Sequence, residues 1–377
     1  MRTLVVTNDF PPRTGGIESF VLAMVQRMPA GSVVVHTARQ TGDRAFDAHL
    51  DVPVVRDSSR FMVPTPAIAR RAADLARAEG CDRVWFGAAA PLALMAPTLR
   101  AAGVRRAVAT THGHEVWWAG VPGTRQALHA IGERTDVVTY LGESTRSRIA
   151  PALSPAARAR MVQLTPGVDP EVFHPDVDGT VVRARHGLQD RPVVVCVSRM
   201  VARKGQDVLV RALPLIRARV PDAALLLVGD GPHRPAVERL VRQLGLERDV
   251  VLTGRVPWGE IQHHFAAGDV FAMPSRTRLG GLEVEGLGIV YLEAAAAGLP
   301  VVAGSSGGAP DAVLDGENGF VVDGRRVVDV ADRVTRLLLD RRLAADFARR
   351  GRQWVLEKWS WSQQADRLQR LLAGHPG

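Results

Sequence analysis

Short apolar runs rich in β-branched residues alternate along the chain with longer segments in which apolar residues recur at helical spacing. Such alternation is typical of parallel sheets, in which a helix connects one strand to the next. The pattern therefore predicts an α/β protein with two doubly wound parallel sheets in tandem. The expected strands are residues 3–7, 33–36, 52–56, 84–86, 108–110, 137–140 and 162–164, followed by 193–197, 225–228, 250–252, 270–273, 301–303 and 320–322.

A segment without hydrophobic period, between Pro166 and Gln189, separates the two series and is rich in Pro, Gly and Asp. It predicts a domain boundary and a cleft between the two sheets. After the last strand the pattern is helical, and with no strand left to pair, the final helix is expected to pack back on the first domain. The expected segments are residues 1–168, 169–358 and 359–377.

Composition adds that the chain is soluble and globular: 46% of its 377 residues are hydrophobic and 23% are charged. It has no apolar run of about 18 residues and no secretory signal pattern, so we expect a cytoplasmic protein. Its two cysteines, Cys81 and Cys196, lie in apolar, strand-like surroundings and are expected to be buried free thiols.

The charge balance is basic, with 48 Lys and Arg against 39 Asp and Glu, which favours contact with polyanions such as phospholipid surfaces or nucleotides. An Arg-rich coding bias explains the same excess equally well. Aromatic residues make up only 5% and no RNA- or DNA-binding motif is visible, so no nucleic-acid partner is expected.

Ligands of open α/β sheets bind beyond the carboxyl ends of the strands, so the loops after the strands carry the candidate chemistry. After the first strand, Gly15 and Gly16 precede a helical pattern and could bring backbone N–H groups close to a phosphate, although a packing turn fits equally well. After the fifth, His112, His114 and Glu115 could bind a metal, act as bases or bind a sugar. A metal is the poorer choice, because no nearby residue completes a ligand set.

In the second series, Arg199, Arg203 and Lys204 follow a strand and precede a helix. Cations there could neutralise a diphosphate leaving group without a metal, although basic runs are more often solvated surface.

The most specific signal is a pair of carboxylates, Glu285 and Glu293, separated by seven residues that include two glycines. We expect a loop over 285–290 and a helix over 291–297, with Glu293 in its first turn accepting hydrogen bonds from a ribose diol. Glu285 would hold sugar hydroxyls, and the N–H groups of residues 288–290 would face the diphosphate. An exposed loop glutamate and a dipole-stabilising glutamate are the alternatives.

These motifs together resemble retaining glycosyltransferase family 4, which has an E-x7-E motif and two facing Rossmann-like domains, the GT-B architecture. The likeness spans nearly the whole chain. The segments VVTNDFPPRTGGIESF, WFGAAAPLALMA, THGHEV, SRMVARKGQD and GGLEVEGLGIVYLEA are similar to an actinobacterial branch of that family. Members of this branch transfer mannose from GDP-mannose to the inositol ring of a phospholipid at the cytoplasmic face of the membrane, with no metal and no cofactor.

The resemblance also implies roles for individual residues. It implies that His112 contacts the transferred sugar, that Glu285 holds mannose hydroxyls and that Glu293 binds the ribose. His114 and Glu115 are expected near the sugar or acceptor. The implied donor-binding positions are Gly16, Arg199, Lys204, Val256, Glu285, Gly288, Ile289, Val290 and Glu293, and the implied catalytic positions are His112, Arg199, Lys204 and Glu285.

Two other functions stay open at this stage. A nicotinamide dehydrogenase would share tandem Rossmann-like units, but the first loop lacks G-x-G-x-x-G. A related family 4 enzyme that uses UDP-glucose or UDP-N-acetylglucosamine is the stronger rival, because the E-x7-E frame does not read the base or the sugar epimer. For a lipid acceptor, Arg70, Arg71 and Arg77 on an amphipathic helix are the expected membrane contacts.

Overall fold

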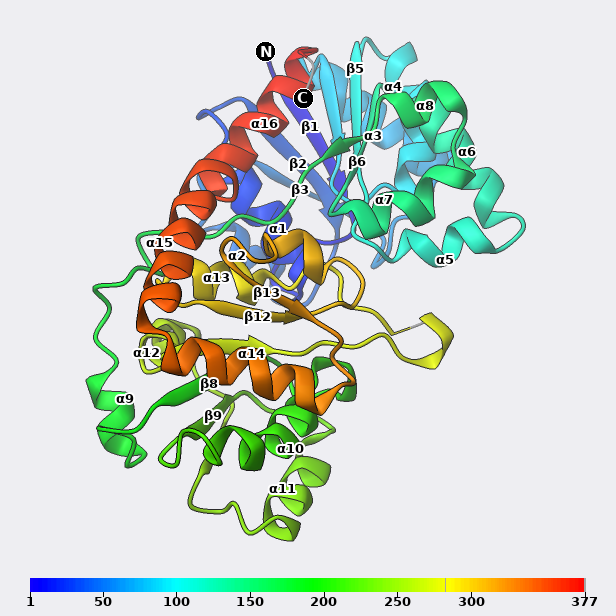
Figure 1. Ribbon diagram of the computed structural model, residues 1–377. Coiled ribbons are helices and arrows are strands. Elements are labelled where there is room, and N and C mark those ends of the chain that lie inside the picture. The colour runs from blue at the N-terminus through cyan, green and yellow to red at the C-terminus, as the bar shows by residue number, and fades with distance from the viewer. Residues whose placement is uncertain (282, 376–377) are drawn as a thin grey trace. The chain divides into compact units, whose positions relative to one another are not determined.

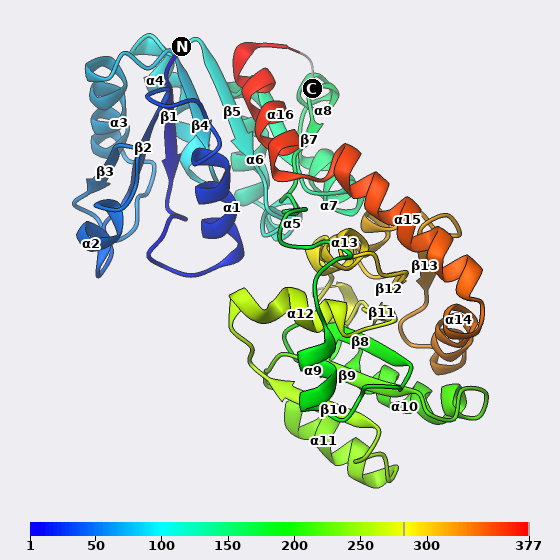
Figure 2. The same ribbon diagram turned by 90° about the vertical axis from the view of Figure 1, so that its left-hand side faces the viewer.

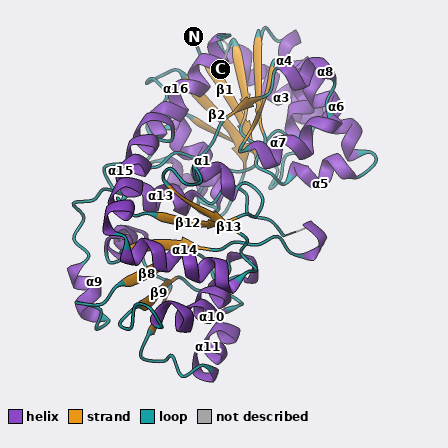
Figure 3. Ribbon diagram, in the orientation of Figure 1, coloured by secondary structure: helices purple, strands orange, loops and turns teal. Residues whose placement is uncertain are grey.

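The computed structural model describes residues 1–281 and 283–375 (Figure 1). Leu282 of the quoted loop and the last two residues of the expected final segment, 376 and 377, lie outside the described residues. The chain divides into two compact units, the first joining Met1–Pro166 with Trp361–Gly377 and the second comprising Gly167–Ser360. Each unit holds one parallel sheet with helices packed on it (Figure 3).

The sheet of the first unit has seven parallel strands in the order β3-β2-β1-β4-β5-β6-β7. The order starts from the centre and proceeds outward in both directions, as in a doubly wound fold. The strands are β1 (Thr3–Thr7), β2 (Val33–Ala38), β3 (Val54–Asp57), β4 (Arg83–Phe86), β5 (Arg106–Thr110), β6 (Val137–Tyr140) and β7 (Val162–Gln163).

Successive residues of strand β1 point to opposite faces of this sheet. Leu4 belongs to a core that includes Ile68 and Leu99, whereas Val5 belongs to a core that includes Phe20 and Leu368. Because successive side chains of a strand alternate, both faces are covered and both are apolar. The helices of this unit are α1 (Gly16–Val25), α2 (Asp43–Asp47), α3 (Pro66–Ala78), α4 (Ala96–Ala101), α5 (Glu115–Gly120), α6 (Thr124–Arg134), α7 (Glu143–Ile149), α8 (Pro155–Ala159) and α16 (Trp361–Ala373) (Figure 2).

The sheet of the second unit has six parallel strands in the order β10-β9-β8-β11-β12-β13. The strands are β8 (Val193–Val197), β9 (Ala224–Val228), β10 (Val250–Gly254), β11 (Val270–Met273), β12 (Val301–Gly304) and β13 (Gly319–Val322). The helices are α9 (Thr180–Arg185), α10 (Gln206–Arg217), α11 (Arg234–Gln243), α12 (Ile261–Ala266), α13 (Ile289–Ala296), α14 (Val327–Leu339) and α15 (Arg341–Lys358).

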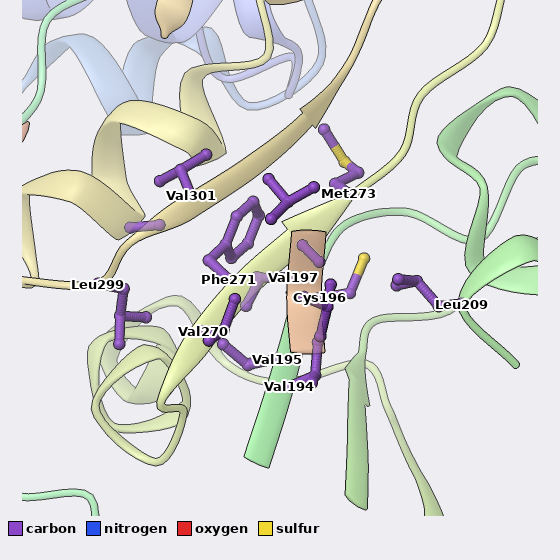
Figure 4. Close-up of a cluster of buried hydrophobic side chains, with 14 of the residues drawn as sticks. Val194, Val195, Cys196, Val197, Leu209, Val270, Phe271, Met273, Leu299 and Val301 are labelled. Atoms are coloured by element: carbon purple, nitrogen blue, oxygen red, sulfur yellow. The ribbon is translucent and has the colours of Figure 1, made fainter. Parts of the chain in front are cut away.

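The core of the second unit is built around its two central strands. Val195 of β8 and Phe271 of β11 are fully buried and pair directly across the sheet (Figure 4). Cys196 also points into this core, and burial raises the pKa of its thiol to about 11. Cys81 is buried in the first unit with its pKa raised to about 11 by the same cause. Both cysteines are free thiols, as the sequence predicts.

All thirteen expected strands are present, with ends that differ by no more than two residues from the predicted ones. The predicted α/β class with two doubly wound parallel sheets is therefore confirmed. In the part of the chain that the structure describes, no helix combines the length and the apolar character needed to cross a membrane.

Candidate active site

The second unit contains a cavity of about 580 Å³ at the carboxyl ends of β8, β9 and β10. It lies at the edge of a parallel sheet where ligands of such folds bind. Of the residues predicted to bind the donor, Arg199, Val256, Val290 and Glu293 line it together. Its other lining residues are Val197, Ser198, Val228, Gly229, Asp230, Gly231, Arg255, Trp258 and Ile261.

Arg199 reaches this cavity from the loop that follows β8. It is exposed, and no ion pair of its guanidinium is recorded among residues 1–281 and 283–375. Its backbone is held in place, because Gln206 Nε2 donates a hydrogen bond of 3.3 Å to the Arg199 carbonyl. The charge of Arg199 is therefore available to an anionic ligand.

Lys204 is placed by a short turn of 3₁₀ helix, Ala202–Lys204, that ends at Gly205. Gly205 has a φ of +82°, and a Cβ at this position would lie 2.2 Å from the carbonyl oxygen of Pro274, so only glycine allows this approach. The Lys204 ammonium makes an ion pair of 2.7 Å with Glu285 Oε2, and both side chains are about nine-tenths buried. The two residues predicted from separate motifs are thus one buried pair.

Glu285 is held by its backbone as well as by Lys204. Its N–H donates to Ser306 Oγ at 3.2 Å, and its carbonyl accepts a hydrogen bond of 2.9 Å from Gly308 N. Ser306 and Gly308 belong to the loop after β12, so this loop supports Glu285. Because Glu285 is only 6% exposed, the alternative of a solvated loop glutamate is wrong.

Glu293 lies two residues later in its helix than the sequence predicts. We expect a helix from 291 with Glu293 in its first turn, but α13 begins at Ile289 and Glu293 is in the second turn. The reason is Gly288, which caps the helix in the left-handed conformation at φ +76° and ψ +62° and lets the helix start at once. Gly288 and Ile289 thus form the helix start, while Val290 reaches the cavity.

The Glu293 carboxylate is buried, and burial raises its pKa to about 7, against the opposing charge of Lys204. No hydrogen bond or ion pair of this carboxylate is recorded within the described part of the chain. A buried acceptor without a partner is costly unless a ligand supplies donors. Glu293 is therefore suited to hydroxyl groups in the cavity.

In the first unit, the loop after β5 forms a turn anchored by Glu115. This side chain is fully buried, and its Oε2 accepts hydrogen bonds from the backbone N–H groups of His112 at 3.0 Å and Gly113 at 3.1 Å. His114 Nε2 lies 3.3 Å from the other oxygen, Oε1. Burial raises the pKa of Glu115. The carboxylate is used within the protein and holds the turn that presents His112.

His112 is a neutral, oriented imidazole. Its Nε2 lies 2.7 Å from the carbonyl oxygen of Gly87, which can only accept, so Nε2 carries the proton and Nδ1 is left as an acceptor. Burial lowers the pKa of His112 to about 4. The ring of Phe20, on α1, packs edge-on against it at 5.2 Å between centroids. His112 can therefore accept a hydrogen bond but carries no charge at neutral pH.

Gly16 is exposed at the start of α1, and a Cβ there would meet no atom within 4 Å. The preceding Gly15 is also exposed, and a Cβ there would lie 2.2 Å from Glu18 Oε2. Arg13 donates to Glu18 Oε1 and to Asp9 Oδ1, at 2.6 Å in both cases. This charged cluster is not predicted from the sequence. Asp9 and Arg13 nevertheless lie in the loop after the first strand, and such loops are the expected location of ligand-binding residues.

Sequence reasoning also missed Asp230 and Trp258 of the cavity. Asp230 stands between two glycines directly after β9, which was a usable signal. Trp258 is 69% exposed at the cavity, and its ring packs edge-on against Phe173 at 6.2 Å. Among the described residues there is no group of three or more His, Cys, Asp or Glu side chains that could hold a metal ion.

Known proteins are similar to this chain in sequence and in fold. A family model described as Glycosyl transferases group 1 matches residues 180–354, and one described as Glycosyltransferase Family 4 matches residues 14–172. Over 376 residues the chain is 50% identical to a protein of Mycolicibacterium smegmatis named GDP-mannose-dependent alpha-(1-6)-phosphatidylinositol monomannoside mannosyltransferase, with 98% of each chain covered. This chain is a glycosyltransferase of family 4.

The glycosyltransferase is also 48% identical over 380 residues to a protein of the same name from Mycobacterium tuberculosis, with 99% of this chain and 98% of that one covered. Among solved structures, HepE of Anabaena in complex with UDP matches with a TM-score of 0.80 at 19% identity, covering 99% of this chain and 100% of that one. Sucrose-phosphate synthase of Thermosynechococcus elongatus matches with a TM-score of 0.75 at 21% identity, covering 99% of both. These likenesses show the fold, and the family and GT-B class expected from the motifs are confirmed.

Proposed function

We propose that this glycosyltransferase transfers mannose from GDP-mannose, with retention of configuration, to the inositol ring of phosphatidylinositol monomannoside, forming an α-1,6 linkage. The single observation that carries this proposal is full-length identity of 48–50% to relatives named for that donor, acceptor and linkage.

For the donor, we assign the diphosphate to Arg199 and Lys204, the ribose diol to Glu293 and the base to the backbone around Val256. The support is geometric: Arg199, Val256 and Glu293 line one cavity. Burial raises the pKa of Glu293, and the nearby cation of Lys204 opposes this rise. Glu285 would hold mannose hydroxyls, with its charge already balanced by Lys204 at 2.7 Å. The N–H groups at the start of α13, from Gly288 to Val290, would add hydrogen bonds to phosphate.

For the acceptor, we assign the first unit. From this unit His112 would also contact the transferred sugar, and Gly16 would approach the donor phosphates. The neutral His112 ring has one nitrogen free to accept a hydrogen bond from a sugar hydroxyl. The buried Glu115 holds this turn through a hydrogen bond from the His112 N–H, and His114 lies beside Glu115. No covalent nucleophile is required if the acceptor attacks the face from which the diphosphate departs, and the departing phosphate oxygen would take the acceptor proton.

The lipid acceptor implies contact with an anionic membrane surface at the cytoplasmic face. Of the three α3 arginines expected there, Arg71 makes an ion pair of 2.8 Å with the buried Asp57, and Arg77 pairs with Asp74 at 2.7 Å. Arg70 is left for lipid headgroups. Two exposed apolar side chains, Phe61 (54% exposed) and Val63 (49%), precede the same helix and fit such a surface.

The test is a panel of GDP-mannose, UDP-glucose and UDP-N-acetylglucosamine against phosphatidylinositol and its monomannoside, with products identified by mass and linkage. We expect product only from GDP-mannose with the monomannoside. Transfer from either UDP-sugar at a comparable rate would favour the rival family 4 activity.

Each reaction is repeated with EDTA, because Arg199 and Lys204 are proposed to replace a metal. Loss of turnover that magnesium or manganese restores would overturn that assignment.

A further inference from the structure

A second cavity, of about 530 Å³, lies wholly in the first unit and has no part in the roles assigned above. Three of its six lining residues are arginines. We call it the arginine pocket, and its lining residues are Pro12, Arg13, Arg39, Gln40, Thr41 and Arg60.

The topology of the sheet explains why the arginines meet. Strands β3, β2 and β1 are neighbours, so their carboxyl ends lie side by side at one edge. The loop that follows each of these strands supplies one arginine: Arg13 follows β1, Arg39 follows β2 and Arg60 follows β3. Residues far apart in sequence are thus gathered where parallel sheets bind their ligands.

Hydrogen bonds tie the three loops to one another. Gln40 accepts from the backbone N–H of Arg13 and donates to the carbonyl of Phe10, both at 2.9 Å. The backbone N–H of Arg39 donates to the carbonyl of Ser59 at 3.0 Å. The pocket therefore has a built frame and is not a chance grouping of surface side chains.

The charges in this frame are unevenly balanced. Arg13 is neutralised by Asp9 and Glu18, whereas no ion pair of Arg39 or Arg60 is recorded in the described part of the chain. The nearby carboxylate of Asp43 is engaged by the backbone N–H groups of Gln40 and Arg44. The charge of Asp43 also acts on Arg39, but neither Arg39 nor Arg60 is held in a recorded ion pair, so both guanidinium groups can bind an external anion. Guanidinium forks match phosphate oxygens in bidentate geometry, so phosphate is the chemistry that this pocket fits.

The position of the pocket points to the acceptor as the source of that phosphate. Arg13 lines the pocket and also pairs with Asp9 of the same loop. Burial raises the pKa of the Asp9 carboxyl, and the nearby His114 side chain opposes this rise. Through Asp9 the pocket is therefore linked to the turn that carries His112 and His114, where the sugar and the acceptor are expected. The donor diphosphate already has Arg199 and Lys204 of the second unit.

We infer that the arginine pocket binds the phosphodiester group of the inositol phospholipid acceptor, through Arg39 and Arg60. The inference rests on the proposed function, since that function supplies an acceptor with a phosphodiester. It adds a specificity site: the enzyme would select phosphorylated inositol acceptors over neutral inositol mannosides.

The test uses two water-soluble acceptors: mannosyl-inositol phosphoglycerol, which keeps the phosphodiester, and mannosyl-inositol, which lacks it. In the variant R39Q/R60Q, KM for the phosphodiester acceptor should rise about 10- to 100-fold, as expected for lost hydrogen bonds to a charged group. The kcat, the KM for GDP-mannose and the KM for mannosyl-inositol should stay unchanged. The matched control is R239Q/R242Q on α11, which removes two exposed arginines of the second unit and should change none of these values.

An unchanged KM for the phosphodiester acceptor in R39Q/R60Q would overturn the inference. So would a loss confined to sedimentation with phosphatidylinositol vesicles, because the pocket would then hold bulk lipid headgroups. In calorimetric titrations, inorganic phosphate should bind the wild-type enzyme at least tenfold more weakly than mannosyl-inositol phosphoglycerol, and equal affinities would contradict an acceptor site.

Failure of the proposed function gives a different result. In that case the wild-type enzyme makes no product from either inositol acceptor. Calorimetry still tests whether the arginine pocket binds the phosphodiester. If mannosyl-inositol phosphoglycerol binds the wild-type enzyme and R39Q/R60Q abolishes this binding, the inference is supported. If it does not bind the wild type, the inference is overturned.

Discussion

Glu293 of the second unit and Glu115 of the first differ in what their buried carboxylates bind. Both are almost inaccessible to solvent, and burial raises the pKa of both. Glu115 accepts two hydrogen bonds from backbone N–H groups. Glu293 borders a cavity, and no such partner is recorded for it among the described residues. Neither burial nor a raised pKa therefore separates a structural carboxylate from a ligand-binding one, but the hydrogen-bond partners do.

The cationic side chains also differ in whether they are paired within the protein or face the cavity. Arg71 is paired with a buried aspartate and belongs to the fold, whereas Arg199 faces the cavity without a recorded ion pair. Lys204 belongs to both classes, because it pairs with Glu285 and also acts on Glu293 through its charge. Substitutions at these positions should therefore separate losses of stability from losses of ligand binding.

The largest effect is expected for Lys204→Met. Loss of one cation that stabilises the leaving diphosphate should lower kcat/KM about 100- to 1,000-fold. It also leaves Glu285 buried without its partner, which should destabilise the protein by about 3 kcal/mol. The double variant Lys204→Met/Glu285→Gln serves as the control, since it should regain stability in denaturant titrations but not activity. Recovery of activity in the double variant would show that Lys204 acts only through the fold.

Glu115→Ala should destabilise the protein without weakening the binding of the donor. Two backbone N–H groups lose their acceptor in a buried site, so the free energy of unfolding should fall by about 3 kcal/mol. Urea titration measures this loss, and GDP binding by calorimetry should stay unchanged. A fall in GDP affinity with unaltered stability would reverse the roles assigned to Glu115 and Glu293.

Much of the second unit's site follows from the sequence, because its residues lie in short segments directly after strands. The spacing of Glu285 and Glu293 and the position of Lys204 after β8 are local features of the sequence. The two glycines between Glu285 and Glu293 indicate the loop that precedes α13. The helix start was misplaced because a left-handed Gly288 cap depends on the backbone conformation and not on residue type alone.

Pairing between distant segments could not be predicted in this way. Lys204 and Glu285 are 81 positions apart, and Arg13, Arg39 and Arg60 follow three different strands. Their meeting depends on strand order, which alternating apolar runs do not specify. For the same reason, the two possible states of Glu115, engaged by the backbone or open to a ligand, look identical in the sequence.

Without ligand, Glu293→Gln should change how the stability of the protein depends on pH. The pKa of Glu293 is about 7 in the folded state and about 4.5 when unfolded. The native protein thus loses stability as the pH rises from 4.5 through 7, by at most about 3 kcal/mol. Glutamine removes this loss, so the variant should be more stable than the wild type at pH 8 and equal to it near pH 4.5. Denaturant midpoints at both values measure the difference, and an equal gain at both would show that ionisation is not its cause.

The smallest effect is expected on the pH dependence of donor affinity. The ionised Glu293 carboxylate should bind ribose hydroxyls better than the protonated form, so GDP affinity should fall up to about tenfold as the pH drops from 8 to 6. This dependence should disappear in Glu293→Gln. It should persist in His112→Gln, because burial keeps the pKa of His112 at about 4 and the ring is neutral over this whole range. Calorimetry of the three proteins at pH 6, 7 and 8 makes the comparison. If the dependence vanished in His112→Gln and remained in Glu293→Gln, the titrating group at the donor site would be in the first unit, and Glu293 would lose its assignment to the ribose.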